Sequence, residues 1–275
     1  MSQVEFIHEH LSILLVLIPL LAAPVTVLLP GGRAPWAMTM AVTWSCFLLA
    51  IWLLSDVAGG TAMHYELGGW APPWGIEYRI DALNALLALL VAGTGALVAV
   101  YAGPSLRDEI QHDLHGYFHA AFQLCLLGLL GIVLTGDIFN LFVFLEISSL
   151  SSYALISMGR GRQALMAAFQ YLVMGTIGAT FFLIGVGLAY AATGTLNMTD
   201  MAAHLVNVNQ QHIVHTAFAF LFVGVGLKMA MFPLHQWLPN AYAKAPSMVP
   251  IFLAATATKV ADYVLGRSVF TVLTA

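Results

Sequence analysis

Charged side chains are scarce in this sequence. Asp, Glu, Lys and Arg make up only 8% of its 275 residues, whereas 60% are hydrophobic, and the mean hydropathy is +0.89. This composition excludes a soluble globular domain and is typical of a polytopic helical membrane protein. The net charge of −4 is small and spread over loops. There is no basic patch, so nucleic-acid binding has no support.

Cysteine is nearly absent, and no sequence pattern for a cofactor is present. The two cysteines, Cys46 and Cys125, lie far apart in apolar runs, which favours buried packing over a disulfide or a metal pair. No glycine-rich phosphate loop occurs. His112, His115 and His119 have a spacing that a metal could use, but the acidic residues around them favour a solvated helix end. We therefore expect no cofactor and no bound metal.

Long hydrophobic runs make up most of the sequence. They predict an all-α membrane protein with about eight transmembrane helices. The predicted spans are residues 11–30, 36–57, 80–103, 115–135, 137–158, 163–193, 213–234 and 247–268.

Two of the connections between these spans are long. Residues 58–79 include Trp70 and Trp74 among turn-forming residues, which predicts a small β-hairpin or an interfacial loop anchored by tryptophan. Residues 194–212 are polar and predict a short surface helix. No Lys or Arg precedes the first apolar run, so residues 1–10 do not look like a cleaved signal peptide.

Orientation follows from the basic residues in the loops, because cytoplasmic loops carry an excess of Lys and Arg. Alternating spans group Arg33, Arg107, Arg160, Arg162 and Lys244 on one side, and Arg79 and Arg267 on the other. The first side is then cytoplasmic, and both ends of the chain lie outside.

Glu146 lies near the middle of the span predicted at residues 137–158. A charged side chain at the bilayer centre costs ~2.5–3.5 kcal/mol on insertion scales, so Glu146 should face protein or water and not lipid. Ser149 and Tyr153 share its helix face and extend a polar stripe. Asp137 lies roughly 13 Å away along the axis and on the opposite face, near the end of the span.

Two lysines inside apolar helical runs carry the charge opposite to that of Glu146. Lys228 and Lys259 are two of the three lysines in the chain, and neither can easily reach water. Burial disfavours the charged form of a lysine, whereas a nearby carboxylate favours it. Moving or neutralising the charge on Glu146 would therefore switch Lys228 between holding and releasing a proton. A purely structural ion pair is the alternative interpretation.

The span that contains Lys228 has the marks of an interrupted helix. Gly224 and Gly226 precede Lys228, and Pro233, which has no N–H to donate, follows it. The pattern predicts a broken seventh helix whose middle lines a polar cavity, as at ion sites in transporters. A plain proline kink is the alternative. His235 adjoins the predicted break and is a candidate for proton transfer, since its charge changes near neutral pH.

Two segments resemble one known family. Residues 135–146, Thr-Gly-Asp-Ile-Phe-Asn-Leu-Phe-Val-Phe-Leu-Glu, resemble the fifth helix of antiporter-like membrane subunits. Residues 228–247, which begin Lys-Met-Ala-Met-Phe-Pro-Leu-His-Gln-Trp, resemble the family's broken seventh helix, and Ala-Thr-Lys-Val at 257–260 resembles its eighth. The family includes the proton-pumping subunits of respiratory complex I and the large subunits of Mrp-type cation/proton antiporters. Within it, these segments are most similar to the D subunit of Mrp antiporters.

The resemblance implies roles for particular residues. Glu146 would tune the neighbouring Lys228, and Lys259 would be the next proton carrier along the membrane. Asp137 would match a second acidic residue near the fifth helix. Asp262 departs from the family pattern, and its i+3 spacing from Lys259 would allow the two to pair.

Only part of the family's architecture is expected here. Members usually carry two inverted five-helix repeats. Residues 1–110 would hold helices one to three, and residues 111–275 would hold the first repeat, helices four to eight. Either a separate polypeptide supplies the second repeat, or the chain is a shortened copy with an altered role. The chain alone is not expected to complete proton translocation.

Three functions remain open from the sequence. The favoured one is a proton-translocating subunit of a multi-subunit Na⁺/proton antiporter. The same fold could serve a redox-driven complex, such as complex I or a membrane hydrogenase, with the electrons carried by other chains. The third is a non-conducting scaffold.

We expect the chain to have no catalytic residues of its own and to lie in the inner (plasma) membrane as a multi-pass protein. Its expected partners are other membrane subunits, protons, monovalent cations and lipid.

Overall fold

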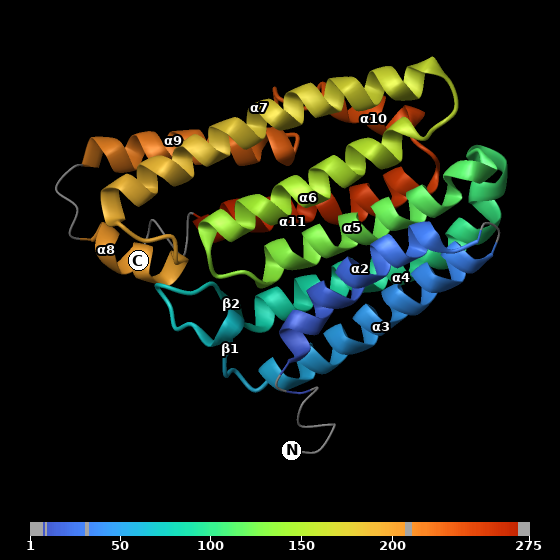
Figure 1. The fold of residues 1–275 in the computed structure, drawn as a ribbon. Helices are drawn as coiled ribbons and strands as arrows, with labels where there is room; N and C mark the ends of the chain where they lie inside the picture. The colour runs from blue at the N-terminus through green and yellow to red at the C-terminus, as the bar shows by residue number, and fades with distance from the viewer. Residues whose placement is uncertain (1–7, 9, 31–32, 207–210, 269–275) are drawn as a thin grey trace.

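The computed structural model describes residues 8, 10–30, 33–206 and 211–268, and most of this part of the chain is helical (Figure 1). The elements are α2 (Leu11–Leu28), α3 (Ala34–Val57), β1 (Met63–Glu66), η1 (Leu67–Gly69), β2 (Glu77–Ile80), α4 (Ala82–Glu109), η2 (His112–Leu114), α5 (His115–Leu134), α6 (Ile138–Ser157), α7 (Arg162–Thr193), α8 (Met198–Leu205), α9 (Gln211–Lys228), α10 (Trp237–Lys244) and α11 (Met248–Arg267). The long helices run side by side as one bundle.

Seven helices in the described residues are long and apolar enough to cross a membrane: α2, α3, α4, α5, α6, α7 and α11. The sequence predicted about eight, and α9 occupies the place of the predicted seventh. Gln211, His212 and His215 at its start and Lys228 at its end make α9 less apolar than the rest. The predicted all-α membrane fold is confirmed, and the predicted seventh span is interrupted, because α9 ends at Lys228 and the next helix begins at Trp237.

The two long connections form the elements that their sequences predicted. Residues 58–79 hold most of an antiparallel hairpin, in which Met63 pairs with Ile80 and Glu66 with Glu77. The polar stretch at 194–212 contains the short helix α8. Both lie at the end of the bundle where α5 turns into α6 (Figure 1).

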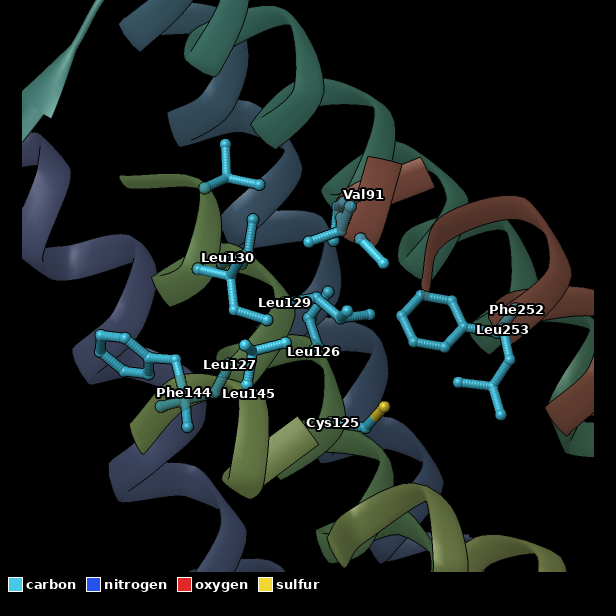
Figure 2. Packing of buried hydrophobic residues seen from close by; sticks show 14 of the residues in the cluster. Val91, Cys125, Leu126, Leu127, Leu129, Leu130, Phe144, Leu145, Phe252 and Leu253 are labelled. Atoms are coloured by element: carbon cyan, nitrogen blue, oxygen red, sulfur yellow. The ribbon is translucent and has the colours of Figure 1, made fainter. Parts of the chain in front are cut away.

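The helix α5 is the centre of the bundle. It packs against α2, α3, α4, α6 and α11, and most of its residues are buried. Figure 2 shows its leucines lying between Phe144 and Leu145 of α6 on one side and Phe252 and Leu253 of α11 on the other. This packing holds α6, which carries Glu146, at a fixed depth beside α11.

The buried start of α5 corrects one expectation. The sequence predicted a solvated helix end at His112, His115 and His119, yet His115 and His119 are only 7% and 3% exposed. The reason is that the end of α2 covers this turn, with the Thr26 carbonyl close to Gly116. Among the described residues, no group of three potential metal ligands comes together.

Polar contacts tie the helix ends together at the hairpin end of the bundle. Arg267, the last residue of α11, donates from Nη2 to Asp81 Oδ2 and to Asn84 Oδ1, each at 2.6 Å. The amide of Asn197 donates to Glu77 Oε1 at 2.7 Å, which ties the turn before α8 to the hairpin. These contacts fix the loops that flank α6 and α11.

A carboxylate caps α11 at the opposite end of the bundle. Glu109 Oε2 accepts a hydrogen bond from the backbone N–H of Ser247 at 2.5 Å, and its Oε1 accepts one from Ser105 Oγ at 2.8 Å. Burial raises the pKa of Glu109, but these hydrogen bonds and the nearby Arg160 hold it below its usual range. The contact anchors the connection between α10 and α11.

Basic residues gather at the two ends in the grouping that alternating spans predict. The end with α10 carries Arg33, Arg160, Arg162 and Lys244, and the hairpin end carries Arg79 and Arg267. That the first end is cytoplasmic stays a prediction.

The pair α7 and α9 makes the most extensive helix contact in the bundle, and glycines permit the close approach. A Cβ at Gly224 of α9 would lie 2.6 Å from the backbone nitrogen of Phe182 in α7.

We expect Gly224→Ala to destabilise the protein by ~1–3 kcal/mol, the usual cost of overpacking. Gly187→Ala is the matched control, because nothing lies within 4 Å of the position that its Cβ would take. Thermal unfolding of the purified protein should separate the two, and equal stabilities would show that the helices can part at no cost.

Candidate functional site

The helix α9 ends at Lys228, as the sequence predicted for a broken helix. Past Lys228 the backbone hydrogen bonds no longer follow the helical pattern. The Met231 N–H donates to the Gly226 carbonyl at 2.9 Å, and Ala230 adopts the left-handed region at φ 55°. For a residue with a Cβ this conformation costs ~1–2 kcal/mol, so the surrounding packing must hold it. The chain resumes a helix only at Trp237, the start of α10.

An ion pair joins the broken helix to α6. Lys228 Nζ lies 3.1 Å from Glu146 Oε1 and donates to Ser149 Oγ at 2.6 Å. The lysine side chain is 7% exposed and that of Glu146 is 25% exposed. Because Lys228 is the last residue of α9, the carbonyl end of that helix also favours its positive charge.

Two small cavities adjoin Lys228. One, lined also by Glu146, is otherwise mostly apolar, with Phe182 and Gly224 among its walls. The other, called the polar cavity below, is lined on one side by Ser148, Ser149, Ser152, Tyr171 and Lys228 and on the other by apolar residues of α5, α6 and α11. Its volume of about 30 Å³ is enough for roughly two waters.

Of the other predicted site residues, none joins the ion pair directly. Lys259 is exposed near the middle of α11, although the nearby Val260 and Ala261 line the polar cavity. No ion pair between Lys259 and Asp262 forms in the described part of the chain. The pairing that their spacing allowed is therefore wrong for this structure, in which both side chains are exposed.

His235 and Asp137 lie outside the two cavities. His235 is exposed within the break, where its ring lies beside Phe232. Asp137 caps the start of α6, and its Oδ1 accepts from the Asn140 N–H at 2.7 Å. Burial raises the pKa of Asp137, and backbone hydrogen bonds from Asn140 and Phe139 oppose the rise. It occupies the turn before the membrane-spanning part of the helix, a separate place from Glu146.

Two aromatic residues beside Lys228 were not anticipated from the sequence. Tyr171 of α7 lines the polar cavity, and Trp237 stacks on it from α10. Trp237 belongs to the same sequence segment as Lys228, which is a usable signal. Tyr171 lies in a long apolar run and has no local pattern that would single it out.

Long apolar helices, an interrupted helix and an ion pair between them define a polytopic membrane protein with ionised groups in its interior. Buried charges of this kind are the mark of ion-moving membrane proteins. The chain belongs to the NADH:quinone oxidoreductase/Mrp antiporter membrane family, whose model matches residues 135–275.

Known relatives bear names from both branches of this family. The chain is 45% identical over 264 residues to NADH-quinone oxidoreductase subunit N of Desulforudis audaxviator, covering 95% of this chain and 52% of the relative. It is 37% identical over 271 residues to the D subunit of a probable K⁺/H⁺ antiporter of Rhizobium meliloti, covering 94% and 49%. The chain thus spans about half the length of these relatives.

The fold is also found in a solved structure. A chain of the membrane-bound sulfane sulfur reductase, an archaeal respiratory membrane complex, superposes with a TM-score of 0.88 at 34% identity. The match covers 93% of this chain and 52% of that one. These comparisons establish an antiporter-like membrane subunit and leave open which complex it serves.

Proposed function

We propose that this chain is a proton-translocating subunit of a multi-subunit cation/proton antiporter, with Lys228 as the group that binds and releases the proton. The observation that carries the proposal is the contact of 3.1 Å between Lys228 and Glu146 at the break in α9. Two chemical facts support the proposal. The ammonium group of Lys228 can release its proton and become neutral, and the polar cavity beside Lys228 can hold water.

The pair gives a simple switch. With Glu146 ionised and close, the ammonium form of Lys228 is favoured; when the carboxylate is protonated or moves away, the buried lysine releases its proton. Ser149 accepts from the same Nζ and helps to hold the lysine in place. The waters that the polar cavity can hold would receive or deliver the proton.

Lys259 is the proposed next carrier, and its position points to a partner. Lys259 and Asp262 lie exposed in the central part of α11. A charge facing lipid at that depth would cost ~2.5–3.5 kcal/mol or more. We therefore propose that a further protein element, such as another membrane subunit, covers this face of α11 in the working complex.

A spin label tests that covering. In a Cys46→Ala, Cys125→Ala background, a nitroxide at Ala255→Cys, one turn before Lys259, should be shielded from lipid-dissolved oxygen within the complex. The matched position is Leu48→Cys of α3, whose side chain is 61% exposed among apolar neighbours, and it should be readily reached. Equal oxygen accessibility at the two positions would argue that α11 faces lipid.

A redox-driven complex is the second candidate function. The similarity to a relative named NADH-quinone oxidoreductase subunit N favours it, and the electrons would then run through other chains. A third possibility is a scaffold in which the ion pair is structural. Cation/proton exchange by the reconstituted complex in liposomes, with and without an electron donor, separates the first two. For each of these functions we propose that the chain lies in the plasma membrane.

A further inference from the structure

An aromatic stack stands beside the polar cavity. The rings of Tyr171 and Trp237 lie parallel, with centroids 4.0 Å apart and planes 2° from each other. Tyr153 of α6 meets the ring of Tyr171 edge-on at 4.5 Å. Tyr171 and Trp237 are only 6% and 5% exposed. The stack therefore joins three helices, α6, α7 and α10.

Trp237 is bonded to the end of the broken helix. Its Nε1–H donates to the Leu227 carbonyl at 3.1 Å, one residue before Lys228. This carbonyl lies in the last turn of α9, where the regular helical pattern has ended: it accepts from the Ala230 N–H at 3.3 Å, and the Met231 N–H, its regular donor, turns instead to Gly226. Movement at the end of α9 must therefore stretch this bond or carry the indole with it.

Tyr171 separates the cavity from α10. It lines the same cavity as Lys228 and three serines, and Tyr242 of α10 and Cys125 of α5 lie near it. Tyr242 is only partly buried, and α10 ends at the exposed Lys244. The stacked rings of Tyr171 and Trp237 therefore lie between the cavity and α10.

We propose that the Tyr171–Trp237 stack is the gate through which water reaches Lys228 from the α10 end of the bundle. When the rings are stacked, they cover the cavity on the side of α10; when the end of α9 shifts, the bonded indole is drawn off Tyr171 and the cavity opens on that side. The gate rests on the proposed function, since it serves proton exchange at Lys228. It adds Tyr171 and Trp237 to the residues that act in proton exchange, and it says that water enters from the α10 end, which the ion pair alone does not specify.

A native thiol reports on this gate. Cys125 is fully buried, and its Sγ lies 3.4 Å from Ser152 Oγ, which lines the cavity. The other cysteine, Cys46, lies elsewhere against the Leu15 carbonyl and is removed as Cys46→Ala. The assembled complex in membrane vesicles of known orientation is treated with a charged, membrane-impermeant methanethiosulfonate. Modification of Cys125 is followed by mass spectrometry.

Opening the gate should expose the thiol from one side only. We expect Tyr171→Ala and Trp237→Ala to raise the modification rate at least about tenfold, and only when the reagent is on the face bearing Lys244. Tyr171→Phe keeps the stacked ring and should leave the rate unchanged. The matched control is Phe182→Ala, which removes another buried α7 ring, one that lines the apolar cavity. Its rate should remain low.

Two results would overturn the gate. One is a rate in the Tyr171→Ala and Trp237→Ala complexes no higher than in Phe182→Ala. The other is faster modification from the hairpin face. Should an alanine variant fail to assemble, Trp237→Leu gives the same readout. Thiol modification does not depend on transport, so it can succeed even if Lys228→Arg retains full transport, and the gate and the proposed function can fail separately.

Discussion

Lys228→Arg is expected to leave the complex assembled and to remove most of its proton-coupled transport. Arginine retains the positive charge and most of the length, so the contact with Glu146 and Ser149 can persist and a structural ion pair would survive. Guanidinium does not release its proton in proteins. A carrier that must alternate between charged and neutral forms therefore fails, and transport should fall by at least about tenfold.

The measurement is cation/proton exchange in inverted vesicles that carry the whole complex, with subunit content checked on native gels. Lys244→Arg is the matched control, because Lys244 is an exposed lysine at the end of α10. Its variant should transport normally. Full activity in an assembled Lys228→Arg complex would make Lys228 a structural charge and favour the scaffold.

Glu146→Gln is expected to have the second largest effect, on both stability and transport. It leaves the ammonium of Lys228, 7% exposed, without its anion. Breaking a buried pair from one side typically costs ~3–5 kcal/mol, and the 25% exposure of Glu146 places the expected loss near the lower end of that range. The double variant Glu146→Gln, Lys228→Met removes both charges. It should recover most of the stability and none of the transport.

Thermal unfolding of the purified complex and vesicle exchange together make this test. Glu66→Gln, at an exposed carboxylate of the hairpin, is the control for loss of one negative charge. Transport that recovers together with stability in the double variant would mean that the pair only holds α6 and α9 together.

The bundle and its break could be predicted because their causes are local. Long apolar runs can be read one helix at a time, and so can Pro233 following Lys228 within an apolar span. Glu146 and Lys228 could be paired in advance because each is too costly to leave facing lipid. For the same reason we expect Lys259 to need a partner, whichever element supplies it.

The remaining features depend on packing between distant segments. The burial of His115 and His119 follows from the position of α2, which their own spacing does not reveal. Lys259 and Asp262 have the spacing of a helical ion pair, yet both side chains are exposed and unpaired with each other in the described structure. Tyr171 meets Trp237 only because the break in α9 turns α10 back onto α7. That turn has no signature in the sequence around Tyr171.

The central claim, that Lys228 changes its protonation state during transport, can be observed directly because the chain has only three lysines. Nitrogen NMR of a complex in which only this subunit is labelled at lysine Nζ, with Lys244→Arg and Lys259→Arg used to assign the signals, follows each amine separately. We expect the Lys228 resonance to show both the ammonium and the amine form within the pH range over which the complex transports. A single ammonium signal throughout that range, with transport intact, would contradict the claim.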